Sequence, residues 1–405
     1  MKLEYIINNP EKALDYMERY VNDGSPSGFT MKYNTSEKTS PFGNREWFYL
    51  CSISYPSQWS INIGDLPPFL EKEFPRDSIL VHPDYNQAFD KTQITQTTIR
   101  VTPTSSARTV RMLDDNYYLK LNYFGVLGRI YRNLTINHAL ASFEVSDILY
   151  NVLGKKNFEK LSFFPERSAK VVLKNKENIN MGIVVRDSIP FGGNSNVIKY
   201  KIPMFSLFSK DRKSKDDTAL LIQLINNLNA EPKEFVLKEI IYPIIKYYFQ
   251  LIGTVGLQPE WHAQNLLLGL DERMNVCSFI MRDMESIDID QNIRDKLGLK
   301  SCLSCYPYKH INESQYNYTI KHSFMFDFKL CKYLIEPIIE CISVYYKLDM
   351  DDLIAEVRNY VDMKIKELPY DFFPKCWYSF QPVIINQEIN QRPYINNGKP
   401  IYRSF

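Results

Sequence analysis

Two short apolar runs separated by a polar stretch lie in the second half of the chain. They cover residues 265–270 and 276–281, and the residues between them run from Asp271 to Asn275. Short apolar runs bounded by turn residues are typical of strands, and two of them this close together predict a β-hairpin. Folding back would return Asp283, just after the second run, to the neighbourhood of Asn265.

Two further segments show alternation of the strand type. If Thr102 to Val110 is extended, its period of two puts Thr104, Ser106 and Arg108 on one face. In Tyr117 to Tyr123, the same period places Tyr118, Lys120 and Asn122 opposite the Leu residues, so that Lys120 is a cation on the polar side of a strand.

The next segment, Phe124 to Asn133, is expected to form a helix with Arg129 and Arg132 one turn apart on one face. These arginines, Lys120 and the nearby hydroxyls can converge on phosphate, because Arg gives bidentate contacts and Lys a point charge. The alternative is a solvated strand face with ordinary Lys and Arg side chains.

The coarse organisation indicates an α+β protein with three lobes. Residues 1–75 mix an amphipathic helix from Glu11 to Val21 with turns, and are expected to form a reduced N-terminal lobe. Residues 76–232 are expected to be a β-rich central lobe, and residues 233–405 a helical C-terminal lobe around the hairpin. The apolar helix candidates Phe235 to Ile252, with a kink at Pro243, and Phe324 to Tyr346 contain charges, which predicts core helices and not membrane spans.

Composition narrows the class of partner. The 49 basic and 47 acidic side chains give a net charge of +2, so no broad attraction to nucleic acid is expected. Seven cysteines and the lack of a signal peptide favour a cytoplasmic protein without a disulfide framework. Cys302 and Cys305 with His310 lack a nearby second pair of ligands, which disfavours a structural zinc site.

The hairpin carries candidate chemistry at its ends. Asn265 and Asp283 offer the hard oxygen ligands that Mg²⁺ takes alongside phosphate oxygens, and His262 precedes them on a loop. A protein kinase has the same layout, with an Asp base two residues after the loop His. This chain has Gln264 at that position, so the usual agent for removing a proton from an alcohol is missing. The alternative is a hairpin with a capping Asn and a surface Asp.

The order of these residues resembles the NRPS-independent siderophore synthetases, the IucA/IucC family. The resemblance extends from about residue 82 to 377, and it includes residues 181–186, 326–330 and 374–376. It rests on Ser106-x-Arg108-Thr109, Lys120, Arg132, Glu260-x-His262-x-x-Asn265 with its three following Leu residues, and Arg282-Asp283.

The resemblance implies a fold and a set of site residues. The expected fold is a multi-lobed cupped hand, with fingers-like central and palm-like C-terminal lobes and a kinase-like nucleotide-binding hairpin. ATP would contact Ser106, Arg108, Thr109, Lys120, Arg132, His262, Asn265 and Asp283. Of these, His262, Arg108, Lys120 and Arg132 would be catalytic, and Glu260, Asn265 and Asp283 would hold Mg²⁺.

The implied reaction is an ATP-dependent ligation. The enzyme would adenylate a carboxylic acid, citrate or a derivative, and condense it with an amine or hydroxyl, releasing AMP and pyrophosphate. Such a reaction belongs to siderophore, metallophore or related natural-product biosynthesis. The resemblance also implies a homodimer, and the shortened N-terminal region leads us to expect an acid presented by a carrier or partner protein.

The chain departs from the family pattern in one respect, and two other functions remain as alternatives to the ligase. Family members have a longer region before the motif His82-Pro83, so the acid site here is expected to be more open, or completed by another chain. A small-molecule phosphotransferase would share the hairpin but form ADP, and Gln264 counts against it. A non-catalytic nucleotide-binding homologue is disfavoured by Lys120, His262 and Asp283.

Overall fold

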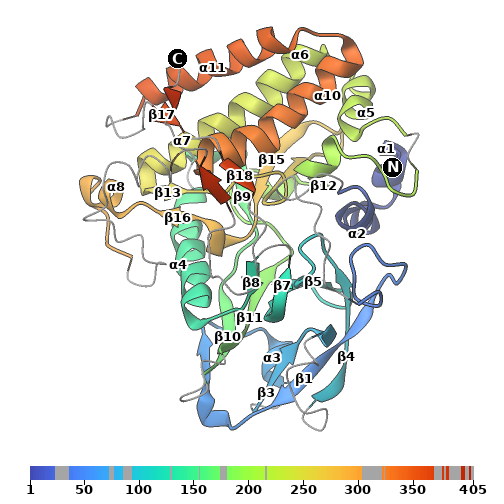
Figure 1. Cartoon of the computed structure of the whole chain (residues 1–405), viewed down its shortest axis with the longest axis vertical. Coiled ribbons are helices and arrows are strands. Elements are labelled where there is room, and N and C mark those ends of the chain that lie inside the picture. The colour runs from blue at the N-terminus through green and yellow to red at the C-terminus, as the bar shows by residue number, and fades with distance from the viewer. Residues whose placement is uncertain are drawn as a thin grey trace.

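A large antiparallel sheet forms the lower half of the molecule as drawn in Figure 1. The computed structural model describes residues 1–22, 36–72, 77–84, 94–127, 130–154, 156–173, 180–214, 217–302, 322 and 324–368, with four short strands beyond them. The sheet has the order β2-β10-β11-β6-β5-β4-β1-β3. Its strands are β1 (Phe48–Ser54), β2 (Ser60–Ile63), β3 (Ser78–Val81), β4 (Ile94–Pro103), β5 (Thr109–Met112), β6 (Tyr117–Leu121), β10 (Ser168–Leu173) and β11 (Asn180–Asp187).

This sheet contains strands from both sides of the lobe boundary that the sequence predicts near residue 75. Strands β1 and β2 precede that boundary, yet β1 pairs with β4 and β2 pairs with β10. Hydrogen bonds of the ladder therefore join residues 48–63 to strands of the expected central lobe. The division of the chain into three lobes stays a prediction.

The predicted hairpin is present. Strand β14 (Leu266–Leu270) pairs antiparallel with β15 (Val276–Met281), and every residue of both strands is buried. Two strands from the preceding part of the chain extend it into a sheet of order β12-β14-β15-β9, with β9 (Leu161–Phe163) and β12 (Tyr200–Pro203) at its edges. The continuous apolar runs reflect this burial, because helices and neighbouring segments cover both faces.

Helices form the upper layer, and Figure 1 shows this small sheet between them and the large sheet. The helices of the second half are α5 (Leu220–Asn227), α6 (Pro232–Glu234), α7 (Tyr242–Val255), α8 (Gln291–Lys296), α10 (Glu336–Tyr346) and α11 (Met350–Lys366). Segments of π-helix, η7 (Phe235–Ile241) and η9 (Phe324–Ile335), precede α7 and α10. The expected kink at Pro243 thus takes the form of a change of helix type, because proline, the second residue of α7, has no N–H to donate.

The first helices belong to the upper half of the molecule. Helix α1 (Leu3–Asn8) is followed by α2 (Pro10–Tyr20), which confirms the helix expected over residues 11–21. Their apolar side chains, such as Ile6 and Met17, share one hydrophobic core with α7, α10 and the hairpin. A second core lies on one face of the large sheet, and on its other face α4 (Ile136–Leu153) covers a third core around Val171 and Val184.

The prediction of one continuous strand from Thr102 to Val110 is wrong for residues 104–108. Strand β4 ends at Pro103 and β5 begins at Thr109, and the residues between them form a turn in which Ala107 has a φ of 62°. Hydroxyl groups close the turn, since the Thr104 Oγ1 donates to the Thr109 carbonyl oxygen at 2.6 Å and the Thr109 N–H donates to the Ser106 Oγ at 3.1 Å. These local hydrogen bonds of Ser and Thr side chains stabilise a turn where the alternation of residue types predicted a strand.

The helix expected over Phe124 to Asn133 is also wrong. Strands β7 (Tyr123–Leu127) and β8 (Ile130–Arg132) form a hairpin there, with Tyr123 opposite Arg132. The segment holds two glycines and several aromatic and β-branched residues, which favour strands over helices. Arg129 lies outside the described residues, as do Cys305, His310 and Lys375.

The remaining elements are short. They include α3 (Pro68–Lys72), β13 (Leu257–Gln258) paired with β16 (Asp288–Ile289), and two pairs near the C-terminus, β17 (Cys376–Trp377) with β20 (Ile401–Tyr402) and β18 (Phe380–Pro382) with β19 (Tyr394–Asn396). In the described part of the chain, no helix has the length and apolarity needed to cross a membrane.

The turn at Gly192 and Gly193 generates a stability prediction. Gly193 has a φ of 48°, and a Cβ there would lie 2.6 to 2.9 Å from three backbone oxygens. Gly193→Ala should lower the free energy of unfolding by at least about 1–2 kcal/mol, the cost of a left-handed Ala alone. Gly154→Ala is the control, because Gly154 has a φ of −70° and open space around it. Equal denaturant midpoints for the two variants would contradict the packing described for this turn.

Candidate active site

A polar cavity lies where the large sheet meets the hairpin. The turn between β4 and β5, strands β6, β8 and β11, and the two ends of the hairpin contribute its walls. The lining residues are Thr104, Ser106, Arg108, Thr109, Lys120, Arg132, Arg186, Gln264, Asn265, Arg282 and Asp283. Most residues predicted to contact a nucleotide, from Ser106 to Asp283, are thus brought together, whereas Glu260 and His262 do not line this cavity.

A buried lysine joins the two halves of the site. Lys120 on β6 is only 1% exposed, and its Nζ contacts a carboxylate oxygen of Asp283 and lies 2.6 Å from a carboxylate oxygen of Glu285. Burial opposes the charge of Lys120, but the two carboxylates outweigh burial and raise its pKa. The lysine is therefore protonated and tied to the segment that follows the hairpin.

The backbone at Asp283 makes this double contact possible. Asp283 has a φ of 70° and a ψ of 66°, and the short 3₁₀ helix η8 (Met284–Ser286) follows it. The left-handed conformation costs a non-glycine residue about 1–2 kcal/mol. It turns the chain so that Glu285 reaches the same lysine as Asp283. Strain of this kind is commonly found at functional sites.

Both carboxylates are held in the ionised form. Burial would raise their pKa values, but Lys120 and Arg108 outweigh it for both groups, and Arg186 adds to the effect on Asp283. The pKa of Asp283 is lowered far below its usual range, and that of Glu285 is lowered to about 2. Both carboxylates are therefore negatively charged at neutral pH.

Cations dominate the wall of the cavity. Arg108, Lys120, Arg132, Arg186 and Arg282 line it, against a single carboxylate, that of Asp283. Arg186 lies 3.6 Å from Asp283 and makes a buried ion pair of 2.5 Å with Glu166. Burial, helped by the neighbouring charge of Arg108, lowers the pKa of Arg132. Such a surface favours a ligand with several negative charges.

Asn265 faces this cavity with its side-chain oxygen available. Its Nδ2 donates to the Glu260 carbonyl oxygen at 3.2 Å and to the Ser286 Oγ at 3.1 Å, which fixes the orientation of the amide. Within the described residues, neither the Asn265 Oδ1 nor the Asp283 Oδ2 has a hydrogen-bond partner. Hard oxygen atoms of this kind fit Mg²⁺ when phosphate oxygens and water complete its shell.

The third expected metal ligand points elsewhere. The carboxylate of Glu260 lies 2.6 Å from the Nζ of Lys329 and lines a second cavity. Among the described residues, no group of three or more His, Cys, Asp or Glu side chains is arranged to hold a metal ion. Asn265 and Asp283 would therefore need the ligand's own oxygens to bind a cation.

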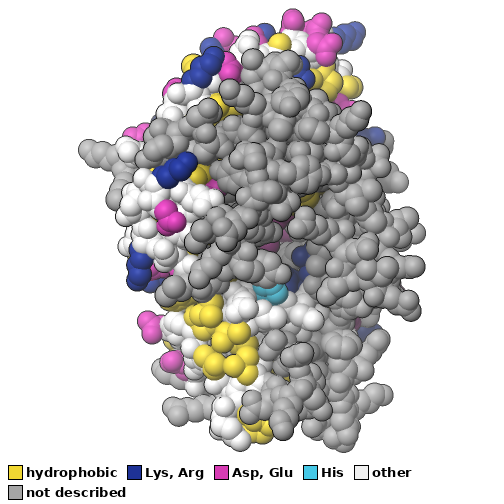
Figure 2. All heavy atoms as spheres, turned by 60° about the vertical axis from the view of Figure 1, so that its left-hand side comes forward, with side chains coloured by type: hydrophobic (Ala, Val, Ile, Leu, Met, Phe, Trp, Pro, Cys, Tyr) yellow, Lys and Arg dark blue, Asp and Glu magenta, His cyan; other side chains and the backbone are white. Residues whose placement is uncertain are grey.

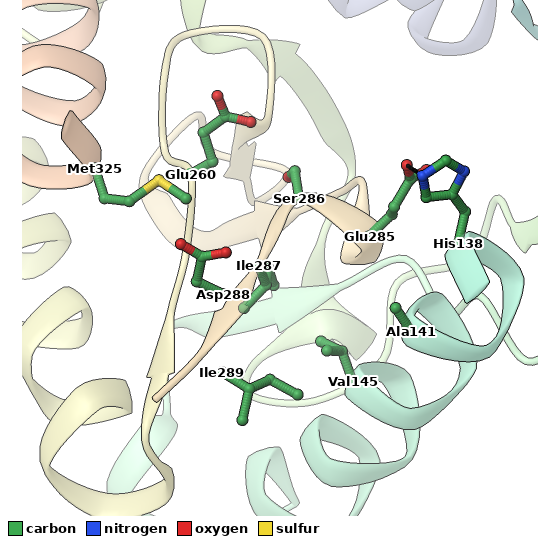
Figure 3. Close-up of a pocket in the computed structure, with 10 residues that line it drawn as sticks. All are labelled: His138, Ala141, Val145, Glu260, Glu285, Ser286, Ile287, Asp288, Ile289 and Met325. Carbon is green, nitrogen blue, oxygen red and sulfur yellow. Dashed lines mark ion pairs between the residues drawn. The ribbon is translucent and has the colours of Figure 1, made fainter. Parts of the chain in front are cut away.

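Glu285, which contacts Lys120 of the first cavity, lines a second cavity, and Figure 3 shows the walls of this second cavity. It is lined by His138, Ala141, Val145, Glu260, Glu285, Ser286, Ile287, Asp288, Ile289 and Met325. Figure 3 shows the side chains of His138 and Glu285 directed toward each other, with the His138 Nε2 3.7 Å from a Glu285 carboxylate oxygen. Three carboxylates and no Lys or Arg belong to this lining, and two of the carboxylates are compensated by lysines outside it, Glu260 by Lys329 and Glu285 by Lys120.

Two histidines near the cavities are neutral. Burial lowers the pKa of His138, and burial together with Lys329 lowers the pKa of His262 well below its usual value. In both rings Nδ1 accepts a backbone N–H, that of Thr135 for His138 and that of Gln264 for His262, so Nε2 carries the proton. His262 is 5% exposed, and its imidazole can donate a hydrogen bond but adds no charge.

Sequence reasoning missed several charged residues of this site. Glu285 follows Asp283 at a spacing of two, and that spacing was an available signal. Arg186 lies within the motif of residues 181–186, but no role was assigned to it. Glu18, Glu166 and His138 come from distant segments, and no local pattern places them here.

The surface drawn in Figure 2 shows basic side chains beside a histidine where the two halves meet.

Comparison of sequences identifies no relative, because no family model and no curated protein matches this chain. Comparison of structures, in contrast, identifies proteins of similar fold. The petrobactin biosynthesis protein AsbB from Bacillus anthracis str. Sterne aligns with a TM-score of 0.62 and 16% identity, over 82% of this chain and 64% of that one. This chain therefore spans somewhat less than two thirds of the AsbB structure.

Two aerobactin synthetases from a hypervirulent pathotype of Klebsiella pneumoniae align as well. ATP-bound IucA gives a TM-score of 0.66 at 12% identity, over 92% of this chain and 75% of IucA. IucC gives 0.64 at 12% identity, over 93% of this chain and 74% of IucC. The chain therefore has the α+β fold of the IucA and IucC synthetases, as its ordered motifs predicted.

Proposed function

We propose that this protein is an ATP-dependent ligase that adenylates a carboxylic acid and condenses it with an amine or hydroxyl, in siderophore, metallophore or related biosynthesis. The observation that carries the proposal is the cavity in which Lys120, Asp283 and Asn265 meet several arginines. The fold supports it, since one protein of this fold, IucA, is an aerobactin synthetase with bound ATP.

The triphosphate would lie in the cationic cavity. Arg108, Lys120 and Arg132, which line this cavity, would contact its oxygens, and the hydroxyls of Ser106 and Thr109 would donate hydrogen bonds to it. Mg²⁺ would be held by the Asn265 Oδ1 and the Asp283 Oδ2, with phosphate oxygens and water completing its shell. The pairing of Glu260 with Lys329 makes Glu260 the weakest of the three proposed metal ligands. His262 would donate from its Nε2 to the α-phosphate.

The reaction requires stabilisation of growing negative charge. A carboxylate oxygen attacks the α-phosphorus, and the bond to the β-phosphate oxygen breaks, so that pyrophosphate leaves with its electron pair. Fixed cations that face this region stabilise the charge without reorganisation. The neutral amine nitrogen or the hydroxyl oxygen of the acceptor then attacks the acyl carbon. The bond from that carbon to the AMP oxygen breaks with its electron pair going to AMP, and the acceptor's proton passes to water. No protein nucleophile takes part in either step.

Gln264 supports a ligase over a phosphotransferase. Its side-chain amide donates to the Ser105 Oγ at 3.1 Å, and its backbone oxygen accepts from Arg282 at 2.5 Å. An amide has no basic site for removing a proton from an alcohol, so a kinase-like step lacks its base. The same intact set of charges around Lys120 counts against a non-catalytic homologue.

The acceptor would occupy the second cavity. Its lining contributes the carboxylates of Glu260, Glu285 and Asp288 without a Lys or Arg, which disfavours an anionic acceptor. Glu285 belongs to this wall and also contacts Lys120, so the acceptor would lie next to the activated acyl group.

Reaction products give the first test of function. Incubation with ATP, Mg²⁺, a panel of carboxylates and hydroxylamine should yield AMP, pyrophosphate and a hydroxamate with the correct acid. Asp283→Asn is the control for a contaminating enzyme and should abolish all three products together. Formation of ADP and a phosphorylated product would contradict the ligase.

A second prediction concerns the metal site. Asp283→Asn and Asn265→Ala should lower kcat on the order of 10²–10³-fold, because each removes a group that positions Mg²⁺ and the phosphates. The melting temperature of Asn265→Ala should fall much less than that of Gly193→Ala, whereas Asp283→Asn also removes a charge that compensates buried Lys120 and should lower the melting temperature. Full activity in both variants, or unfolding of both, would make these residues structural.

A third prediction concerns the charge of the acceptor. Once the acid is known, a linear diamine should show a KM about tenfold lower than an amino acid of equal length, which corresponds to about 1.4 kcal/mol. The KM for ATP should not depend on the acceptor. Equal KM values for the two acceptors would show that the carboxylates of the second cavity do not select charge.

A further inference from the structure

A buried glutamate from the N-terminal helix α2 reaches both halves of the candidate site. The Glu18 side chain is 3% exposed. Its Oε1 accepts from the NH1 of Arg282 at 2.6 Å, and its Oε2 accepts from the backbone N–H of Ser105 at 3.0 Å. One carboxylate thus contacts the end of the hairpin and the turn between β4 and β5.

These contacts form part of a closed ring of hydrogen bonds. The Arg282 Nε donates to the Gln264 carbonyl oxygen at 2.5 Å, and the Gln264 Nε2 donates to the Ser105 Oγ at 3.1 Å. The ring Glu18, Arg282, Gln264, Ser105 therefore links three segments that are far apart in sequence. Both hydrogen-bonding ends of the Glu18 carboxylate are used in it.

Three members of the ring adjoin residues proposed to bind the nucleotide or its metal, and Gln264 is one of them because it precedes Asn265. Ser105 precedes Ser106 and the turn that carries Arg108, and Arg282 precedes Asp283. The ring fixes the distance between the phosphate-binding turn and the residues proposed to hold Mg²⁺. A small error in such a distance lowers catalysis strongly, because reacting groups must be aligned.

Glu18 acts on Arg282 through its negative charge as well as through the geometry of its hydrogen bonds. Arg282 is buried, and its NH2 has no hydrogen-bond partner within the described residues. Removing one member of a buried ion pair leaves the other charge uncompensated, which is strongly unfavourable. Without the carboxylate, the guanidinium would be free to turn into the cavity that it lines, where it would compete for Asp283.

We propose that Glu18 is a positioning residue that holds the phosphate-binding turn in register with the metal-binding end of the hairpin. The inference rests on the proposed function, because it concerns the geometry of the same nucleotide site. It also assigns a role to Gln264, the residue at the position of the kinase base, as the amide that closes the ring. Helix α2 is thereby part of the active site.

The same helix offers a matched control. Asp15 lies one turn earlier on α2, and its carboxylate pairs with Arg111 of β5. This pair also joins α2 to the large sheet, but neither residue lines either cavity. If α2 matters only as a support, loss of Asp15 and loss of Glu18 should have similar effects.

The test compares MgATP affinity and thermal stability in the wild type, Glu18→Gln, Gln264→Ala and Asp15→Asn. Calorimetric titration should show MgATP affinity about 10–100-fold weaker in Glu18→Gln, the range found when supporting residues of a site are changed. Gln264→Ala opens the same ring without leaving a buried charge unpaired, so it should also weaken binding and keeps the test decisive if Glu18→Gln does not fold. Asp15→Asn should bind within about twofold of the wild type, since a twofold change is only about 0.4 kcal/mol.

Each result has a definite meaning. Wild-type affinity in Glu18→Gln or, where that variant does not fold, in Gln264→Ala would overturn the positioning role. An equal loss in Asp15→Asn would do the same, because it would show that α2 acts only through stability. Absence of MgATP binding by the wild type would overturn the proposed function itself, and the role of Glu18 with it.

Discussion

The ion pair between Lys120 and Asp283 is the constraint on which the site depends. Lys120 comes from the large sheet and Asp283 from the end of the hairpin, so the pair joins two parts of the fold at one buried point. A buried lysine is costly unless it is paired, and here two carboxylates compensate it. The left-handed backbone at Asp283 is the local cost of bringing both to the same ammonium group.

The charges around this pair are organised in layers. Arginines face the cavity, and carboxylates behind them hold the arginines in place, as Glu166 does for Arg186 and Glu18 does for Arg282. A cavity built in this way keeps its positive lining fixed before a ligand arrives, and preorganised charge is the main source of stabilisation for a reaction between anions. Glu285 lines the second cavity and also contacts Lys120 of the cationic cavity. The anionic nucleotide and the acceptor would therefore lie on opposite sides of Glu285.

Sequence reasoning found the parts of the site whose signal is local. The hairpin follows from two apolar runs and a polar turn, whereas only the family resemblance, and no local pattern, places Lys120 and Asp283 at one site. The turn at Thr104 to Arg108 departs from the strand pattern because side-chain hydrogen bonds stabilise it. The hairpin of β7 and β8 departs from the predicted helix because strand propensity outweighs the helical spacing of the arginines. Glu18 and Glu166 could not be placed, since only tertiary packing brings them to the site. The likeness of the hairpin to that of the kinases stays a prediction.

The central claim is that the cationic cavity activates a carboxylic acid by adenylation, and isotope exchange between pyrophosphate and ATP measures that step alone. With Mg²⁺ and the correct acid, but without any acceptor, radiolabel from pyrophosphate should enter ATP, because adenylation is reversible and needs no amine. The exchange should stop when the acid is omitted. Acid-dependent consumption of ATP to ADP with no label entering ATP would contradict the account.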